Sequence, residues 1–217
     1  MAVDVKICGL TRAEDAALAV AHGAWRLGVI FAGGPRLRTP SQSVEIVAAA
    51  GGVPVIGVFG DQSVEAILAV AAQARLSGVQ LHGPSTVNDA ARLRGAGLEV
   101  WRVARLPADS ELELVGMAEE ADLVLLEPRG AYHLDVAGGR GIAIALSVAL
   151  AARRSLPVGV QVGLAGGLTC DNLADTIRVV HPDAVDVSSG IERSPGIKDS
   201  GRLIRFLEIA RDAHPAA

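Results

Sequence analysis

Short apolar segments alternate along this chain with longer segments of helical period. The apolar segments are rich in Val, Leu and Ile and predict buried strands over 3–7, 26–31, 53–59, 78–81, 98–104, 122–126, 157–162 and 184–187. Ala- and Leu-rich segments between them predict helices near 12–22, 41–50, 63–75, 86–96, 109–119, 142–153, 170–179 and 198–212. The helix near 63–75 shows the pattern best, because Val64, Ile67 and Ala71 fall on one side of it.

This order of elements predicts an α/β fold, a single (β/α)8 TIM barrel spanning residues 1–217. The units are nearly equal in length, and no change of composition marks a linker or a second domain. The alternative is an open, doubly wound sheet, which the same alternation also permits. The short connections favour the closed barrel.

Composition indicates which binding partners and which cellular location to expect for this chain. Half of the residues are apolar but only 3% are aromatic, as expected of parallel strands covered by Ala-rich helices. The net charge of −4 and the dispersed arginines give no reason to expect a nucleic acid or a membrane surface as partner. Sparse cysteines and charges early in the N-terminus predict a cytoplasmic protein without a signal peptide. The histidines show no metal-ligand spacing, and neither a metal nor an organic cofactor is expected.

In a barrel, the residues that follow each strand converge on one mouth. Those positions hold a polar, glycine-rich set in this chain: Cys8, Pro35-Arg36, Gln80 to Gly83, Arg102, Glu127, Gly138 to Gly141, Gly166-Gly167 and Ser188 to Gly190. The last two segments predict a phosphate site, because small residues let backbone N–H groups approach an anion. Gly166 and Gly167 alone would indicate only a tight turn, and the Ser188, Ser189 and Gly190 step one unit later strengthens the phosphate interpretation.

Cys8 is a candidate nucleophile or general base. A buried cysteine is usually a small apolar packing residue. Here Cys8 ends a strand, and Lys6 lies two residues earlier on the same face. A nearby ammonium predicts a depressed thiol pKa. Cys170, at the start of a helix, is interpreted as a packing residue.

Three further positions have candidate roles at the mouth. Glu127 ends an apolar strand and is a candidate general acid with a raised pKa, or alternatively an exposed acid paired with an arginine. Arg36 offers a bidentate fork for a carboxylate or a phosphate, with Arg38 as a competitor. Gln80 and His82 are candidate substrate contacts, although His82 equally suits a structural role at the rim.

These motifs, in this order, resemble the phosphoribosylanthranilate isomerase family of tryptophan biosynthesis. The resemblance rests on Lys6 to Thr11, Pro35-Arg36, Gly78 to Gly83, Leu164 to Thr169, Asp186 to Glu192 and Gly196 to Asp199. It implies a single barrel without cofactor that carries out an Amadori rearrangement of N-(5-phosphoribosyl)anthranilate. It also implies Cys8 as general base, the residue after the sixth strand as general acid, Arg36 on the anthranilate carboxylate, and the last two loops on the phosphate.

The chain departs from the family pattern at its sixth strand, and alternatives follow from that. The acid is usually Asp, and the chain has Glu127, with Asp135 as a weaker substitute. The loop Gly138 to Gly141 and the step Trp25-Arg26 also differ from the usual residues. One alternative is the related histidine-pathway isomerase, against which Cys8 argues. Another is a barrel that binds phosphate ligands without turnover. Either a monomer or a homodimer is compatible with the Ala-rich helix faces.

Overall fold

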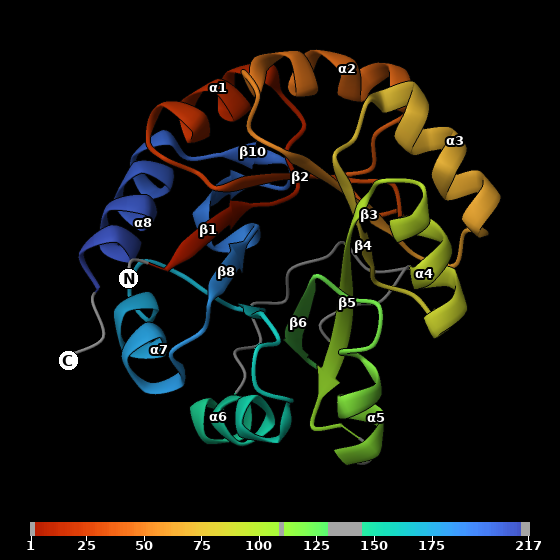
Figure 1. Ribbon diagram of the computed structural model, residues 1–217. Helices are drawn as coiled ribbons and strands as arrows, with labels where there is room; N and C mark the ends of the chain where they lie inside the picture. The colour runs from red at the N-terminus through yellow and green to blue at the C-terminus, as the bar shows by residue number, and fades with distance from the viewer. Residues whose placement is uncertain (1–2, 109–110, 130–144, 214–217) are drawn as a thin grey trace.

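The chain folds into a closed barrel of parallel strands surrounded by helices (Figure 1). This computed structural model describes residues 3–108, 111–129 and 145–213. The barrel strands are β1 (Asp4–Ile7), β2 (Arg26–Ile30), β3 (Val55–Phe59), β4 (Gly78–Leu81), β5 (Glu99–Leu106), β6 (Leu123–Pro128), β7 (Val162–Ala165) and β8 (Ala184–Val187). Because β1 pairs in parallel with both β2 and β8, the sheet has no open edge. The predicted (β/α)8 barrel is confirmed, and the open sheet is excluded.

A helix follows each strand on the outside of the barrel. The helices are α1 (Ala13–Ala21), α2 (Pro40–Ala49), α3 (Val64–Ala74), α4 (Val87–Gly95), α5 (Glu111–Gly116), α6 (Leu146–Ser155), α7 (Leu173–Val180) and α8 (Ser200–Asp212). Local sequence fixes several of their starts. Thr39 with Gln42, and Thr86 with Asp89, form reciprocal caps at the starts of α2 and α4, and Ser63 caps α3. No helix in the described ranges is long and apolar enough to cross a membrane.

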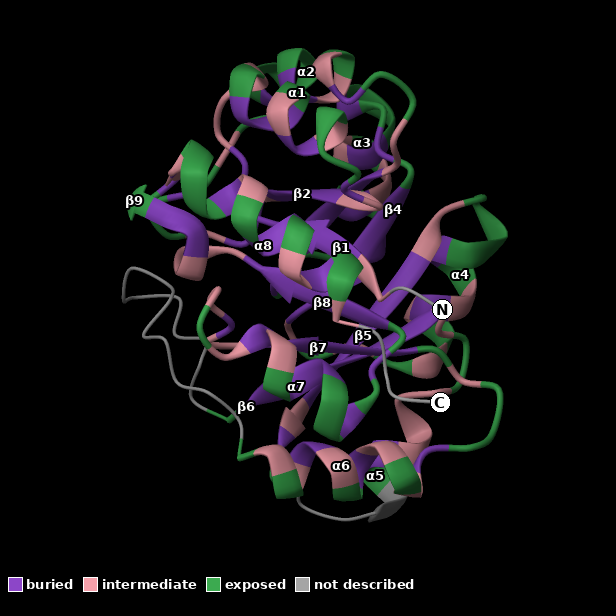
Figure 2. Cartoon of the chain, turned by 90° about the vertical axis from the view of Figure 1, so that its left-hand side faces the viewer, coloured by how far each residue is buried: buried purple, intermediate pink, exposed green. Residues whose placement is uncertain are grey.

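The core has two layers, as the buried strands and the half-buried helices in Figure 2 indicate. The outer layer packs strands against helices, and the inner layer fills the barrel. Trp101 is the largest fully buried side chain of the inner layer and stacks on Trp25 with ring centroids 5.8 Å apart. Apolar side chains from several strands surround it: Ile56, Val103, Leu123, Leu125, Ala165 and Ala184.

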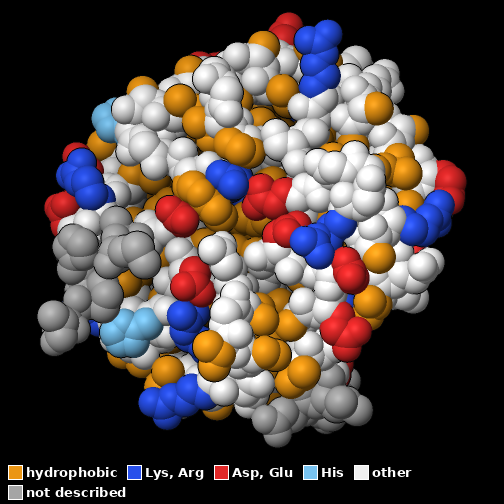
Figure 3. Space-filling model, in the orientation of Figure 1, with side chains coloured by type: hydrophobic (Ala, Val, Ile, Leu, Met, Phe, Trp, Pro, Cys, Tyr) orange, Lys and Arg blue, Asp and Glu red, His pale blue; other side chains and the backbone are white. Residues whose placement is uncertain are grey.

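One end of the barrel, which Figure 3 shows, carries acidic and basic side chains intermixed over its centre. At the end where the strands begin, Arg26 Nε lies 3.0 Å from Glu99 Oε2. The Arg26 guanidinium also lies 4.0 Å from the ring centroid of Trp25. The unusual Trp25-Arg26 step therefore closes the barrel at the end opposite to the carboxyl ends of the strands.

Two sequence-based expectations need correction. The seventh strand is Val162–Ala165 instead of 157–162, because Pro157 and Gly159 form a turn in which Val160 N donates to Pro157 O at 3.2 Å. The fifth strand continues to Leu106, so Arg102 lies within it and not at the mouth. The Arg102 guanidinium instead donates to backbone carbonyls in the helical layer, those of Gly116, Glu119 and Ser85.

A short extension after β8 was not predicted. A single 3-10 turn, η1 (Ser189–Ile191), leads into an antiparallel hairpin of β9 (Glu192–Ser194) and β10 (Ile197–Lys198). The register of this hairpin places Lys198 opposite Glu192. Both residues are buried, at 1% and 8% exposure, so the hairpin carries a charged pair into the interior.

Candidate active site

A buried charge network lies inside the barrel below its mouth. Lys6 on β1 is fully buried, and its Nζ lies 2.9 Å from Asp186 Oδ2 and 2.7 Å from Gln80 Oε1. The ammonium also lies 5.2 Å from the Trp101 ring centroid. Burial alone would lower the pKa of Lys6, but the Asp186 carboxylate outweighs it and raises that pKa. Lys6 is therefore a fixed positive charge that holds Asp186 and Gln80 in place.

Cys8 follows β1 and is 6% exposed, and Cys8 N donates to Val187 O at 2.8 Å. Its thiol has room because Gly28 on β2 has no side chain: a Cβ at Gly28 would lie 2.7 Å from Cys8 Sγ. Burial and the Asp186 carboxylate raise the pKa of Cys8, although the Lys6 ammonium lowers it in part. The expected depression of the thiol pKa is therefore wrong, because burial and the Asp186 carboxylate outweigh the Lys6 ammonium.

Glu127 lies in β6, which is not adjacent to β1 in the barrel. It is 8% exposed, which contradicts the alternative interpretation of Glu127 as an exposed acid. Glu127 Oε2 lies 3.2 Å from His82 Nε2. Burial and the Asp186 charge raise the pKa of Glu127 to about 7. At neutral pH this carboxyl can therefore both hold and release a proton.

Gln80 lies in β4, and His82 directly follows that strand and lies beside the Glu127 carboxyl. Burial, the Arg105 guanidinium and the Lys6 ammonium lower the pKa of His82 to about 3, so the imidazole is neutral at pH 7. Its Nδ1 lies 3.3 Å from Gln80 Nε2. Gln80 is 2% exposed and contacts both Lys6 and His82. Gln80 therefore links the buried Lys6 to the residues at the mouth.

Arg36 lies in the loop after β2 and is 5% exposed, whereas its competitor Arg38 is half-buried and contacts the carbonyl of Leu37. Arg36 Nε and Nη2 donate to the two carboxylate oxygens of Glu192 at 2.9 and 2.6 Å. Lys198 Nζ donates to Glu192 Oε1 at 2.9 Å and to Ser188 O at 3.0 Å. The three charged side chains connect the loop after β2 to the loop after β8.

The loops after β7 and β8 touch where Gly190 approaches Leu168. Gly166 and Gly167 have positive φ values of 89° and 65°, which glycine adopts without strain. A Cβ on Gly190 would lie 1.8 Å from the carbonyl oxygen of Leu168, so only glycine fits at that contact. Ser188 Oγ is buried and has no hydrogen-bond partner within the part of the chain that the structure describes. Ser189 is half-buried in η1.

Some residues of the site were missed from the sequence, and some predicted ones lie outside the described residues. Asp186 and Glu192 stood within a predicted phosphate-binding motif, but no role was assigned to either. No sequence motif pointed to Asn172. Its side chain stabilises the loop after β7, because Asn172 Oδ1 accepts from Thr169 N at 2.8 Å and Nδ2 donates to Gly167 O at 2.9 Å. The loop Gly138 to Gly141 and the substitute acid Asp135 lie outside the described ranges.

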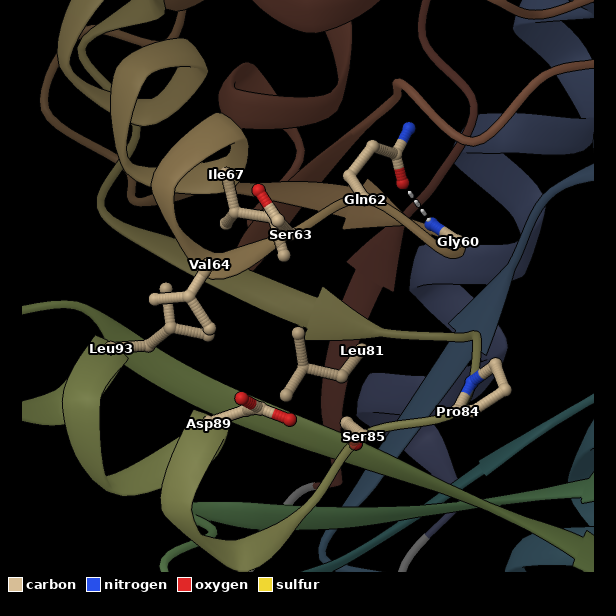
Figure 4. Close-up of a pocket in the computed structure, with 10 residues that line it drawn as sticks. All are labelled: Gly60, Gln62, Ser63, Val64, Ile67, Leu81, Pro84, Ser85, Asp89 and Leu93. Atoms are coloured by element: carbon tan, nitrogen blue, oxygen red, sulfur yellow. Dashed lines mark hydrogen bonds between the residues drawn. The ribbon is translucent and has the colours of Figure 1, made fainter.

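A small cavity of about 70 Å³ lies beside the mouth, between the starts of α3 and α4 (Figure 4). Its walls include Gln62 and Asp89, and both side chains are engaged locally: Gln62 accepts from Gly60 N, and Asp89 caps α4. A water needs about 10–15 Å³ of such space, so this cavity has room for several waters. In the described residues, no group of three or more His, Cys, Asp and Glu side chains is arranged to hold a metal ion.

Comparisons with known proteins agree with this geometry. A family model described as N-(5'phosphoribosyl)anthranilate (PRA) isomerase matches residues 5–209. The N-(5'-phosphoribosyl)anthranilate isomerase of Paracoccus denitrificans is 37% identical over 211 residues, which are 95% of this chain and 96% of that protein. The phosphoribosyl anthranilate isomerase structure from Thermotoga maritima superposes with a TM-score of 0.84 at 31% identity, covering 97% of this chain and 99% of that one. A further phosphoribosyl anthranilate isomerase structure, in complex with reduced 1-(o-carboxyphenylamino)-1-deoxyribulose 5-phosphate, superposes with a TM-score of 0.82 at 30% identity and covers 97% of this chain and 99% of that one.

Proposed function

Because the chain belongs to the N-(5'-phosphoribosyl)anthranilate isomerase family, we propose that it converts N-(5-phosphoribosyl)anthranilate to 1-(2-carboxyphenylamino)-1-deoxyribulose 5-phosphate. The reaction is an Amadori rearrangement in tryptophan biosynthesis. One observation carries the assignment of roles. The Cys8 thiol and the Glu127 carboxyl lie on strands that are not neighbours, and burial raises the pKa of Glu127 to about 7. A base and an acid on different sides of the mouth suit a proton transfer at two atoms of one ligand.

In the proposed reaction, Glu127 donates its proton to the ribose ring oxygen while the C1′–O bond breaks. The anthranilate nitrogen supplies the electron pair, and the ring-opened Schiff base results. Cys8, as the thiolate, then removes the C2′ proton to give an enolamine. The enolamine gains a proton at C1′ and loses the proton of its C2′ hydroxyl, which gives the ketone. No oxidant or cofactor is needed, because the electrons only move from C2′ to C1′. The high pKa of Cys8 makes the thiolate a strong base once it forms.

Two anion sites hold the substrate in this proposal. Arg36 takes the anthranilate carboxylate, because its planar guanidinium matches a carboxylate. Backbone N–H groups of Gly166, Gly167, Ser189 and Gly190, with the hydroxyl of Ser188, take the phosphate. The buried Ser188 Oγ supports this role, since a buried hydroxyl gains from a partner that a ligand supplies. His82 and Gln80 keep the Glu127 carboxyl in place.

The decisive experiment is direct turnover. Purified protein receives freshly prepared phosphoribosylanthranilate, and the loss of anthranilate-type fluorescence is followed, with a protein-free sample as control for spontaneous hydrolysis. The isomerase function predicts a fluorescence decay proportional to protein concentration. A protein that binds the reduced product analogue but gives no protein-dependent decay would instead be a barrel that has lost turnover.

Further properties belong to the same proposal. We regard residues 1–217 as one domain, which the pairing of β1 with β8 supports, because the first and last strands complete the same barrel. A cytoplasmic location stays a prediction, as does the choice between monomer and homodimer. That no metal or organic cofactor takes part is also a prediction. Addition of a chelator such as EDTA is expected to leave the fluorescence decay unchanged.

A further inference from the structure

Three charged side chains form a buried cluster beside the mouth, which we call the Arg36 cluster: Arg36, Glu192 and Lys198. Their side chains are 5%, 4% and 0% exposed. Glu192 sits at the centre, because one of its oxygens accepts from Lys198 and both accept from Arg36. The hydrogen bonds from Arg36 and the Lys198 charge outweigh burial and lower the pKa of Glu192. Glu192 is thus ionised at neutral pH.

The cluster fixes where the guanidinium of Arg36 lies. An arginine has several flexible torsions and loses considerable entropy when it is held. The fork–fork contact of 2.9 and 2.6 Å settles both the position and the plane of the guanidinium before any ligand arrives. The Arg36 side chain passes over Gly9, the neighbour of Cys8, since a Cβ at Gly9 would meet Arg36 Cδ and Ser188 Oγ at 2.6 Å each.

Lys198 extends the cluster to the proposed phosphate loop. Its ammonium spans from Glu192 Oε1 to the carbonyl of Ser188, the first residue of that loop. The Glu192 carboxylate therefore fixes the position of the Arg36 guanidinium directly and the position of the loop backbone through Lys198. A substrate with a carboxylate at one end and a phosphate at the other needs such a fixed spacing.

We infer that Glu192 is a positioning residue that orients the Arg36 guanidinium for a ligand carboxylate. Through Lys198, Glu192 also holds this guanidinium at a set distance from the phosphate loop. Glu192 selects for the carboxylate without contacting the substrate. The inference rests on the proposed function for the identity of the ligand, but its test does not require turnover.

The test measures binding of two ligands. One is reduced 1-(o-carboxyphenylamino)-1-deoxyribulose 5-phosphate, and the other is the same compound without its carboxyl group. Dissociation constants are measured by calorimetry for the native protein, for Glu192→Gln and for Glu99→Gln. Glu99 is the matched control, because it also pairs with an arginine but lies at the other end of the barrel.

The native protein is expected to prefer the carboxylate-bearing ligand. Glu192→Gln should reduce that preference about tenfold or more, equivalent to about 1.4 kcal/mol, while its affinity for the ligand without the carboxyl changes little. Glu99→Gln should keep the native preference. Equal losses for both ligands in Glu192→Gln, or an unchanged preference, would overturn the inference. If Glu192→Gln does not fold, Glu192→Asp retains the charge but withdraws it by one methylene, and it must show the same selective loss.

The outcomes separate this inference from the proposed function. A native protein that prefers the carboxylate ligand but turns over no substrate contradicts the isomerase function and leaves the positioning role intact. A native protein that is active but shows no preference between the ligands contradicts the positioning role alone.

Discussion

Replacing Glu127 with Gln removes the proposed acid while keeping the size of the side chain. The amide cannot donate a proton to the ribose ring oxygen as a carboxylic acid does. Loss of a general acid costs about 100-fold to 10,000-fold in rate. We therefore expect Glu127→Gln to lose kcat/KM on that scale at pH 6, where native Glu127 is mostly protonated.

The size of this loss should itself depend on pH. With a pKa of about 7, Glu127 is about 90% protonated at pH 6 and about 10% at pH 8. The Cys8 thiol, whose pKa lies above its ordinary value of 9.0, is mostly protonated over the same range. The native kcat/KM should rise with pH below 7 as thiolate forms and then level off, because each gain in thiolate is offset by a loss of protonated Glu127.

The assay is the ratio of native to Glu127→Gln kcat/KM, followed by fluorescence from pH 6 to pH 8. The ratio cancels the ionisations of the free substrate and of Cys8, which both proteins share. It should fall about tenfold across this interval, as the protonated fraction of Glu127 does. A ratio that stays constant, or a Glu127→Gln variant as active as the native protein, would refute Glu127 as the acid.

Three other variants test the rest of the site. Cys8→Ser should lower kcat by about 100-fold or more, since the thiolate acts only in proton transfer. The affinity for the reduced product analogue should change little, and a large loss of affinity with kcat retained would contradict this role. Gly190→Ala should weaken binding of inorganic phosphate and raise KM, because its Cβ would lie 1.8 Å from Leu168 O and force the two loops apart; unchanged phosphate binding by calorimetry would speak against the loop site. Lys6→Met should destabilise the fold by about 3–5 kcal/mol in urea unfolding, because Asp186 would be left buried without its cation; a loss below about 1 kcal/mol would show that Asp186 is solvated.

The barrel was predictable from the sequence because its strands are apolar on both faces. Such segments need no knowledge of their neighbours to be recognised. The predicted boundaries of β7 were wrong because apolar residues continue on both sides of this strand. The turn at Pro157 and Gly159 determines where strand pairing begins. The hairpin of β9 and β10 carries no strong pattern, because each strand has three residues or fewer.

The positions of the candidate site residues and the raised pKa of Glu127 were predictable, whereas the partner of Arg36 and the direction of the Cys8 pKa shift were not. That Cys8 and Glu127 end strands follows from the sequence, and the barrel then brings strand ends to one mouth. The partner of Arg36 lies 156 residues away in the chain, and no local spacing connects them. The direction of the Cys8 pKa shift likewise depends on burial and on Asp186, which the pairing of β1 with β8 brings near the thiol.

Three carboxyl groups near the mouth show how environment alone divides their roles. Asp186 has the Lys6 ammonium at 2.9 Å, and Glu192 has both Arg36 and Lys198 within hydrogen-bond distance. Glu127 lies 3.2 Å from the imidazole of His82, whose pKa of about 3 keeps it neutral at pH 7. The Arg105 and Lys6 charges lower the pKa of Glu127, but burial and the Asp186 charge outweigh them and raise it to about 7. A general acid needs a raised pKa. The extra methylene of Glu relative to Asp does not remove it, because burial and the Asp186 charge raise the pKa of Glu127. The pH dependence of the native to Glu127→Gln ratio therefore tests whether this carboxyl is the group that protonates the ring oxygen.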